Sequence, residues 1–437
     1  MIFSKANFGT FSTSFIIQAC GAITGVLTAR LLGPIARGEL ATVILWPTIL
    51  SNLGLMGCNW VLAREVAKDP AKESDWVAAG VAVGVGTAVV YFLSGYFLIP
   101  VLVPSGRRYL VPIARICLLL IPLDICNQLL LAVDQGRMRW RRYNLLRLFF
   151  TLFYMAVICS IGVTHMARVA WFVAALLASH LVSVLLRLWI QRKALASGEF
   201  RFGRCGHLLR TGLPYFGATM SNLASLQFDT ILVVSLLSTQ AAGIYVVASA
   251  LANGQYALGE ALGITSFGLL SNERNPGSQG RIISETFRQS ALISCGAGLV
   301  LVCVIPFLVV PLFGFEFSRA IRPAVVLALA SALLVSTNIL DQGLRGAGRP
   351  HAGLLSQLIG ICAMGLGALF LLRKFGLVGM ACAVGLSACA QLVVLIAAAA
   401  KWLKISALEF WPFGSGNLKL FVQQLAELKL RYSRSLA

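Results

Sequence analysis

Residues 8–40 read FGTFSTSFIIQACGAITGVLTARLLGPIARGEL. Between Phe8 and Leu32 the only charged residue is Arg30. About 20 apolar residues in a helix are enough to cross the hydrocarbon core of a bilayer, so this stretch predicts a membrane-spanning helix. The short connection Gly33 to Gly38 contains a proline and an arginine, and a second apolar run follows it. The stretch therefore predicts two consecutive spans joined by a tight turn.

The same alternation continues along the whole chain and predicts twelve spans. Their predicted ranges are 8–32, 39–63, 76–103, 109–133, 144–163, 168–191, 208–236, 243–270, 287–312, 320–341, 352–372 and 376–400. Composition agrees with this pattern, because 58% of the residues are hydrophobic, 12% are charged and the mean hydropathy is +0.84. Soluble domains carry about 25% charged residues. The predicted fold class is an all-α integral membrane protein, which excludes a soluble enzyme, a disordered chain and a disulfide scaffold.

The chain is strongly basic, with 36 Lys+Arg against 16 Asp+Glu and a net charge of +20. In a soluble protein this balance would indicate nucleic-acid binding. Here the excess lies mainly between apolar runs, which predicts contact with anionic membrane lipids and no nucleic-acid partner. One set of alternate connections, including both termini, holds 26 basic residues and the opposite set holds nine. Basic loops stay in the cytoplasm, so both termini are predicted to be cytoplasmic.

Cysteine and histidine usage predicts no metal site and no cofactor. Most of the eleven cysteines lie inside apolar runs, no C-x-x-C occurs, and the four histidines are scattered. Buried cysteines of this kind behave as small apolar residues. The only small ligand expected is a coupling ion, Na⁺ or H⁺.

The predicted spans divide into two groups of six. The boundaries are an N-terminal six-helix lobe at 1–194, a basic cytoplasmic linker at 195–207, a C-terminal six-helix lobe at 208–404 and a cytoplasmic or interfacial tail at 405–437. In the tail, apolar residues at helical spacing within 417–432 predict either a helix lying on the inner leaflet or a solvated segment.

Weak internal similarity supports the same division. Leu31-Leu32 followed by Gly38 matches Leu236-Leu237 followed by Gly243, at an offset of 205 residues. The run DICNQ at 124–128 matches NILDQ at 338–342 at an offset of 214. The competing explanation is chance similarity between apolar sequences. A true repeat of six spans would give two parallel lobes around a central cavity.

Several short motifs resemble a known family. Ala29 to Pro34 with Arg37-Gly38-Glu39-Leu40, and later Gly212-Leu213-Pro214, Asp229 and Gly243-Ile244-Tyr245, resemble polysaccharide-biosynthesis flippases of the Wzx type. These proteins share a superfamily with multidrug (MATE) exporters and lipid II flippases, and the resemblance covers essentially all twelve spans. It implies that undecaprenyl-pyrophosphate-linked oligosaccharide is moved from the inner to the outer leaflet. Such units feed surface polysaccharides (O-antigen, capsule or exopolysaccharide), so a polysaccharide polymerase and glycosyltransferases are implied as partners.

Four arginines at or near membrane depth are the predicted substrate-binding residues: Arg30, Arg64, Arg115 and Arg147. Guanidinium groups stay charged and bind phosphate oxygens bidentately, as a pyrophosphate cargo requires. Arg115 is predicted to lie deepest. The other three could instead extend to a membrane interface along their aliphatic stems.

Three acids are the predicted ion-coupling residues: Asp124, Asp229 and Glu260. Carboxylates inside a membrane carry protons or pair with cations. A purely structural role is the alternative, as for Asp341, which is placed to pair with Arg345 one turn later. His180 could titrate near neutral pH or serve as an interhelical hydrogen-bond donor.

Two other functions compete with that of a flippase. A cation-coupled multidrug exporter should have an acidic cavity, whereas the first half of this chain is rich in arginine. A membrane enzyme such as a polymerase or ligase needs a sizeable extracytoplasmic loop, and all the predicted outer loops are short. Walker A, G-x-S-x-G and H-E-x-x-H motifs are absent from the sequence, and no enzymatic activity is expected.

Overall fold

The computed structural model describes residues 5–411, apart from 165–166, 256–258, 260–261, 264–265, 267–269, 271–274, 350 and 404–405. Side chains are described in the same ranges except at 5–11, 217–226, 276 and 407. Every regular element in these ranges is an α-helix or a short 3₁₀-helix, which confirms the all-helical class. The predicted ion-coupling residue Glu260 and the predicted tail helix at 417–432 lie outside the described residues.

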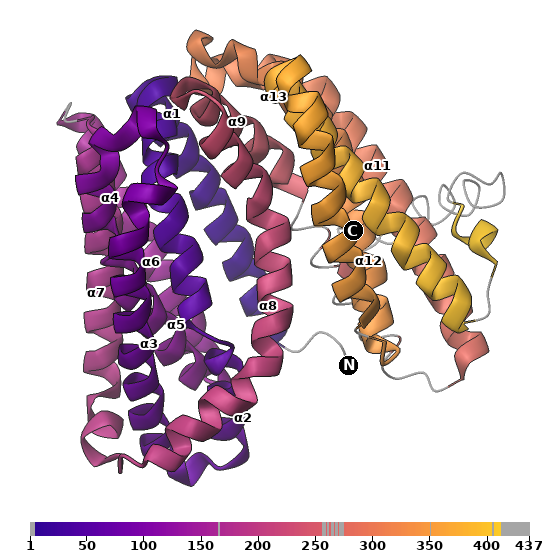
Figure 1. The fold of residues 1–437 in the computed structure, drawn as a ribbon. Helices are drawn as coiled ribbons and strands as arrows, with labels where there is room; N and C mark the ends of the chain where they lie inside the picture. The colour runs from indigo at the N-terminus through magenta and orange to yellow at the C-terminus, as the bar shows by residue number, and fades with distance from the viewer. Residues whose placement is uncertain are drawn as a thin grey trace, which may run out of the picture. The chain divides into compact units, whose positions relative to one another are not determined.

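Figure 1 shows the order of the helices. They are α1 (Lys5–Gly54), α2 (Cys58–Lys68), η1 (Pro70–Lys72), α3 (Glu73–Leu102), η2 (Ser105–Leu110), α4 (Val111–Cys117), α5 (Leu120–Gly136), α6 (Trp140–Val163), α7 (Val169–Ser197), α8 (Phe202–Leu236), α9 (Thr239–Ala252), η3 (Asn253–Gln255), α11 (Pro276–Phe313), η4 (Phe315–Ala320), α12 (Ile321–Gly346), α13 (His351–Leu403) and η5 (Ala407–Phe410).

Eight helical stretches in the described residues are long and apolar enough to cross a membrane. Two helices are longer than a single membrane crossing requires, since α1 has 50 residues and α13 has 53. A helix of that length extends about 75 Å, more than twice the thickness of the hydrocarbon core. Each contains one glycine with a non-helical backbone, Gly33 (φ 69°, ψ 175°) and Gly376 (φ 57°, ψ −131°). Positive φ is readily adopted only by glycine, so α1 and α13 are each two helical segments joined at that glycine. The break predicted after Leu32 is thereby confirmed.

Contacts divide the chain into two compact units. Unit 1 comprises Met1–Val247 with Val310–Ser318, and unit 2 comprises Ala248–Val309 with Arg319–Ala437. The predicted linker 195–207 covers the end of α7, four non-helical residues and the start of α8. Because α8 packs against α2 and α3, it belongs to unit 1 rather than opening a separate body. The division into two lobes of six spans stays a prediction.

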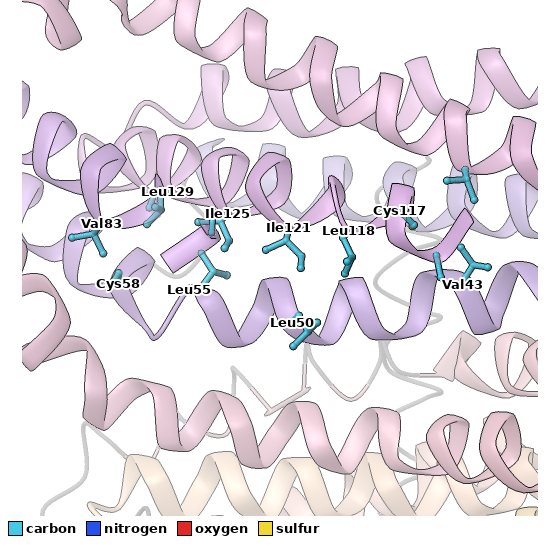
Figure 2. Packing of buried hydrophobic residues seen from close by; sticks show 14 of the residues in the cluster. Val43, Leu50, Leu55, Cys58, Val83, Cys117, Leu118, Ile121, Ile125 and Leu129 are labelled. Atoms are coloured by element: carbon cyan, nitrogen blue, oxygen red, sulfur yellow. The ribbon is translucent and has the colours of Figure 1, made fainter. Parts of the chain in front are cut away.

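The apolar core of unit 1 runs between α1 and the α4–α5 pair. Figure 2 shows Val43 and Leu50 along α1 and Leu55 just after its end, with Leu118 and Ile125 among the side chains beside them. All of these side chains are buried. This core fixes the positions of α1 and α5, whose side chains Ser51 and Asp124 meet in the site described below.

In unit 2, α12 packs against α13 around Leu340, Leu344 and Leu395. Phe287 of α11 and Phe410 of η5 join this cluster, with their rings edge to face and their centroids 5.6 Å apart. Asp341 and Arg345 on α12 form the predicted ion pair at 2.7 Å.

Candidate functional site

Arg115 has an aromatic partner. Its guanidinium carbon lies 4.2 Å from the centre of the Tyr96 ring, a cation–π contact between α4 and α3. The side chain is half-buried, and its Nε atom is buried without a hydrogen-bond partner among the described residues. A buried donor left unpaired is costly, and this nitrogen is one of several such atoms in the described residues.

The other three predicted arginines lie elsewhere in unit 1. Arg30 is exposed and donates to the carbonyl of Pro311, and Arg64 is exposed on α2. Arg147 on α6 donates to Ser14 of α1 at 3.4 Å. Ser14 and Arg30 are separated by roughly 24 Å of helix. The structure therefore does not gather the four arginines around one point.

Asp124 on α5 lies where three helices meet. Its carboxylate accepts hydrogen bonds from Ser51 of α1 at 2.6 Å and from Gln128 at 3.0 Å. Nε2 of His180 on α7 is 3.9 Å from its other oxygen. Nδ1 of the imidazole lies 3.0 Å from the carbonyl of Leu176. With Nδ1 protonated and donating to that carbonyl, Nε2 faces the carboxylate with a lone pair. The contact between Asp124 and His180 thus joins α5 to α7.

A polar seam continues from this pair along the interface of α5 and α7. We define it as Asp124, Asn127, Gln128 and Asp134 of α5 together with His180, Ser183, Arg187 and Gln191 of α7. Ser183 donates to Asn127 at 3.0 Å, and Gln191 donates to the carbonyl of Leu130 at 2.9 Å. Arg187 is only 3% exposed, and its nearest hydrogen-bond acceptors, Ser183 and the Asn127 carbonyl, are both at 3.4 Å.

The spacing of four polar residues in α7 is a signal for this seam in the sequence. His180, Ser183, Arg187 and Gln191 are three or four residues apart, which places them on one helix face. Polar residues at helical spacing inside an apolar span indicate a polar interface with a neighbouring helix.

Two ion-pair clusters adjoin the end of the seam. Asp134 is fully buried and forms an ion pair with Arg142, the first-turn arginine of α6. Glu73 at the start of α3 accepts from both terminal nitrogens of Arg139, at 2.8 and 3.0 Å, and forms an ion pair with Arg137 at 3.0 Å. Ion pairs thus hold the connection between α5 and α6 against α3 and α5.

Asp229 has a partner that the sequence did not reveal. The hydroxyl of Tyr245, a fully buried residue of α9, donates to its carboxylate at 2.8 Å. The backbone N–H and hydroxyl of Thr230 donate to the other oxygen at 2.6 and 3.1 Å. No lysine or arginine lies within one helical turn of Asp229 in the sequence. Hydroxyl donors, rather than a neighbouring cation on the same turn, therefore stabilise this carboxylate. In the part of the chain that the structure describes, no cluster of three or more His, Cys, Asp or Glu side chains could hold a metal ion.

Two glycines 205 residues apart bring the backbones of α1 and α9 together. A Cβ atom on Gly38 would lie 1.8 Å from the carbonyl oxygen of Thr239, and one on Gly243 would lie 1.9 Å from that of Pro34. Pro34 and Thr239 are also 205 residues apart. The contact is reciprocal, as expected where equivalent positions of a repeat meet around a two-fold axis.

Arg107 of η2 stabilises the same end of unit 1. It is only 4% exposed and donates to Thr42 of α1 at 3.0 Å and to the carbonyl of Val234 at 2.9 Å. It also donates to the carbonyl of Leu237. The last carbonyls of a helix lack intrahelical partners and carry the negative end of the helix dipole, so Arg107 caps α8 and ties it to α1.

A second segment completes the reciprocal pattern. Residues 310–318 lie near the break in α1. Arg30 donates a hydrogen bond to the carbonyl of Pro311, and the carboxylate of Glu316 lies 3.1 Å from the position that a Cβ atom on Gly33 would occupy. Thus η2 contacts the end of α8, and η4 contacts the break in α1 through Glu316.

Comparisons with known proteins agree with this architecture. The lipid II flippase MurJ in an inward closed conformation superposes with a TM-score of 0.76 at 12% identity, over 97% of this chain and 92% of that chain. An inward-facing multidrug resistance MATE transporter of the MOP superfamily gives 0.65 at 15% identity, over 91% and 96%. An outward-facing MATE transporter gives 0.64 at 14% identity, over 92% and 97%. These TM-scores show that the chain shares its fold with these proteins.

Sequence comparison is more specific. No protein with a curated description matches the chain. The family model described as polysaccharide biosynthesis protein matches residues 4–254, which is more than half of the chain and confirms the resemblance noted in its motifs. The chain belongs to the polysaccharide biosynthesis protein family.

Proposed function

We propose that this protein is a flippase that moves undecaprenyl-pyrophosphate-linked oligosaccharide across the bacterial inner membrane for surface polysaccharide synthesis. The observation that carries the proposal is the family match over residues 4–254, together with the fold shared with a lipid II flippase. The family match supports a polysaccharide cargo, and the structural similarity to a lipid II flippase supports a cargo that is attached to a lipid. No bond needs to be made or broken by the protein in this reaction.

The proposed architecture has twelve spans in two lobes and works by alternating access. Since α1 and α13 each contain two segments, each supplies two crossings in this scheme. The reciprocal contact of Gly38 with Gly243 supports a repeat whose halves rock against each other. With both termini in the cytoplasm, as the charge bias predicts, this contact lies at the outer end.

We assign the four arginines to successive positions along the cargo path. A pyrophosphate carries two or more negative charges and must cross a low-dielectric region, so a series of guanidinium groups lowers the barrier at each stage. Arg115 is the strongest candidate because its Nε atom has no hydrogen-bond acceptor among the described residues and Tyr96 holds its position.

We assign ion coupling first to Asp124. Its neighbour His180 is a titratable base, so a proton or Na⁺ arriving at Asp124 changes the charge of a contact that joins α5 to α7. Asp229, which hydroxyl groups surround, is the second candidate. Glu260 is the third candidate for ion coupling.

A cation-coupled multidrug exporter is the second candidate function, because the fold is also shared with MATE transporters in two conformations. The two functions make opposite demands on the cavity. Lipophilic drug cations are repelled by arginines and attracted by carboxylates, whereas a pyrophosphate has the reverse preference.

The deciding experiment reconstitutes the full chain in liposomes and measures translocation of a fluorescent undecaprenyl-pyrophosphate oligosaccharide. The same preparation is assayed for ethidium transport. Lipid translocation that Arg115→Ala abolishes, without ethidium transport, supports the flippase. Ethidium transport that survives Arg115→Ala, without lipid translocation, overturns it in favour of the exporter.

A further inference from the structure

An open groove of about 650 Å³ lies beside the connection between α5 and α6, outside the polar seam. Its lining includes Arg139, Trp140, Arg141, Arg142, Leu145 and Ile190. Three arginines in four residues thus meet two aliphatic side chains in one hollow. The function proposed above makes no use of this groove.

The charge of the groove is not fully compensated. Arg139 is paired with Glu73, and Arg142 is paired with Asp134. Arg141 is exposed, and no carboxylate among the described residues lies within 4.0 Å of it. A guanidinium of this kind binds phosphate oxygens through two parallel hydrogen bonds.

The groove lies where membrane-spanning stretches end. One spanning stretch ends at Gly136 and the next begins at Trp140, so the connection between them lies at the level of lipid headgroups. Trp189 of α7 is 61% exposed, and Arg192 lies over its ring at 4.6 Å. Tryptophan is enriched at that level of a membrane, with basic residues beside it.

The apolar part of the groove points to a lipid rather than a free anion. Leu145 lies one turn farther into α6 than Arg141 and is 56% exposed. Ile190 lines the groove from α7. Aliphatic side chains next to a basic cluster suit a ligand with a charged head and a hydrocarbon chain, and basic pockets between spanning helices bind anionic headgroups.

We propose that this groove binds one anionic phospholipid, with its phosphate on Arg141 and an acyl chain along Leu145. The charge selects an anionic over a zwitterionic lipid, because Arg141, unpaired among the described residues, repels the quaternary ammonium group of phosphatidylcholine. Bound there, the lipid joins α6 to α7 beside the ion pairs of Glu73 and Asp134.

The test uses the purified full chain in detergent, titrated with phosphatidylglycerol and followed by thermal unfolding and native mass spectrometry. Phosphatidylglycerol is expected to raise the melting temperature. Arg141→Gln is expected to weaken its apparent affinity about five-fold, which corresponds to about 1 kcal/mol for one basic residue at a membrane surface. Arg210→Gln, an exposed arginine of α8 outside the groove, is the matched control and should leave the affinity unchanged.

The variant Leu145→Gln distinguishes a bound lipid from a free anion, because it changes the apolar part of the groove and leaves the arginines unchanged. It is expected to weaken the binding of phosphatidylglycerol as well. The proposal fails if inorganic phosphate alone gives the same protection, if phosphatidylcholine binds as tightly as phosphatidylglycerol, or if Arg141→Gln and Arg210→Gln have equal effects.

Discussion

Gly38 and Gly243 lie so close that a Cβ atom on either one would come within 2.9 Å of the backbone nitrogen of the other. Real Cβ atoms do not approach backbone atoms that closely, so both positions require glycine for a steric reason. The two residues also occupy matching places in the internal repeat. A similarity of sequence and a contact in space therefore identify the same pair.

Gly38→Ala is expected to destabilise the protein by about 1–3 kcal/mol, because the added methyl group forces α1 away from the Thr239 carbonyl. Gly243→Ala should have a similar effect through Pro34. Thermal unfolding in detergent measures both. Gly21→Ala is the control, since a Cβ there has no atom within 4 Å. Equal melting temperatures for all three variants would contradict the close contact.

Arg107→Gln is expected to cost about 2–3 kcal/mol, because charge-assisted hydrogen bonds to Thr42 and to two carbonyls of α8 are lost. The neighbouring Arg108 is exposed and serves as a matched control. Its glutamine variant should unfold at the wild-type temperature. A similar loss in both variants would mean that net charge, and not the cap on α8, is the cause.

Arg115→Ala is expected to abolish polysaccharide export while the protein still inserts into the membrane, because the cargo loses a phosphate contact. Tyr96→Leu should reduce export more mildly, since a cation–π contact contributes about 0.5–2 kcal/mol. Surface polysaccharide staining and membrane immunoblots measure the two quantities. Normal export by Arg115→Ala would remove this residue from the proposed path.

Asp124→Asn is expected to make translocation independent of the ion gradient, because the amide cannot carry a proton. His180→Gln removes the adjacent base and should shift the pH dependence without removing the carboxylate. Liposomes with imposed pH or Na⁺ gradients report both effects. Asp69→Asn, at an exposed acid that Lys72 neutralises, is the control. Gradient dependence that persists in Asp124→Asn, Asp229→Asn and Glu260→Gln would end the coupling assignment.

The proposed orientation can be tested in a variant lacking the eleven native cysteines, several of which are exposed. Gln240→Cys, near the start of α9, should react with an impermeant maleimide added to intact cells. Ser197→Cys, at the end of α7, should react only after the membrane is permeabilised. The opposite pattern would invert the topology.

Local patterns in the sequence predicted local structure well. The break in α1 followed from a glycine and a proline between two apolar runs, and the Asp341–Arg345 pair followed from helical spacing. These features depend on residues within one or two turns of each other. Helix geometry alone is sufficient to place them.

Contacts between distant residues could not be predicted in the same way. The acceptors of Arg107, the carbonyls of Val234 and Leu237, are about 130 residues away in the sequence. Tyr245 is 16 residues from Asp229, and nothing in the sequence around Asp229 indicates that this hydroxyl is its partner. The four predicted arginines share a charge but not a location. Residue type predicted which groups are costly to bury, and only the packing of α1, α5 and α7 determined where they lie.

The junction at Gly33 has a mechanical consequence. A single residue joins the two segments of α1, so their relative tilt changes mainly through two backbone dihedral angles. No loop is present there to absorb a displacement. The second segment carries Gly38, and the first carries the Ser14 hydroxyl that Arg147 contacts. A rotation of one segment of α1 is therefore passed to the other segment through Gly33 instead of dissipating in a flexible linker.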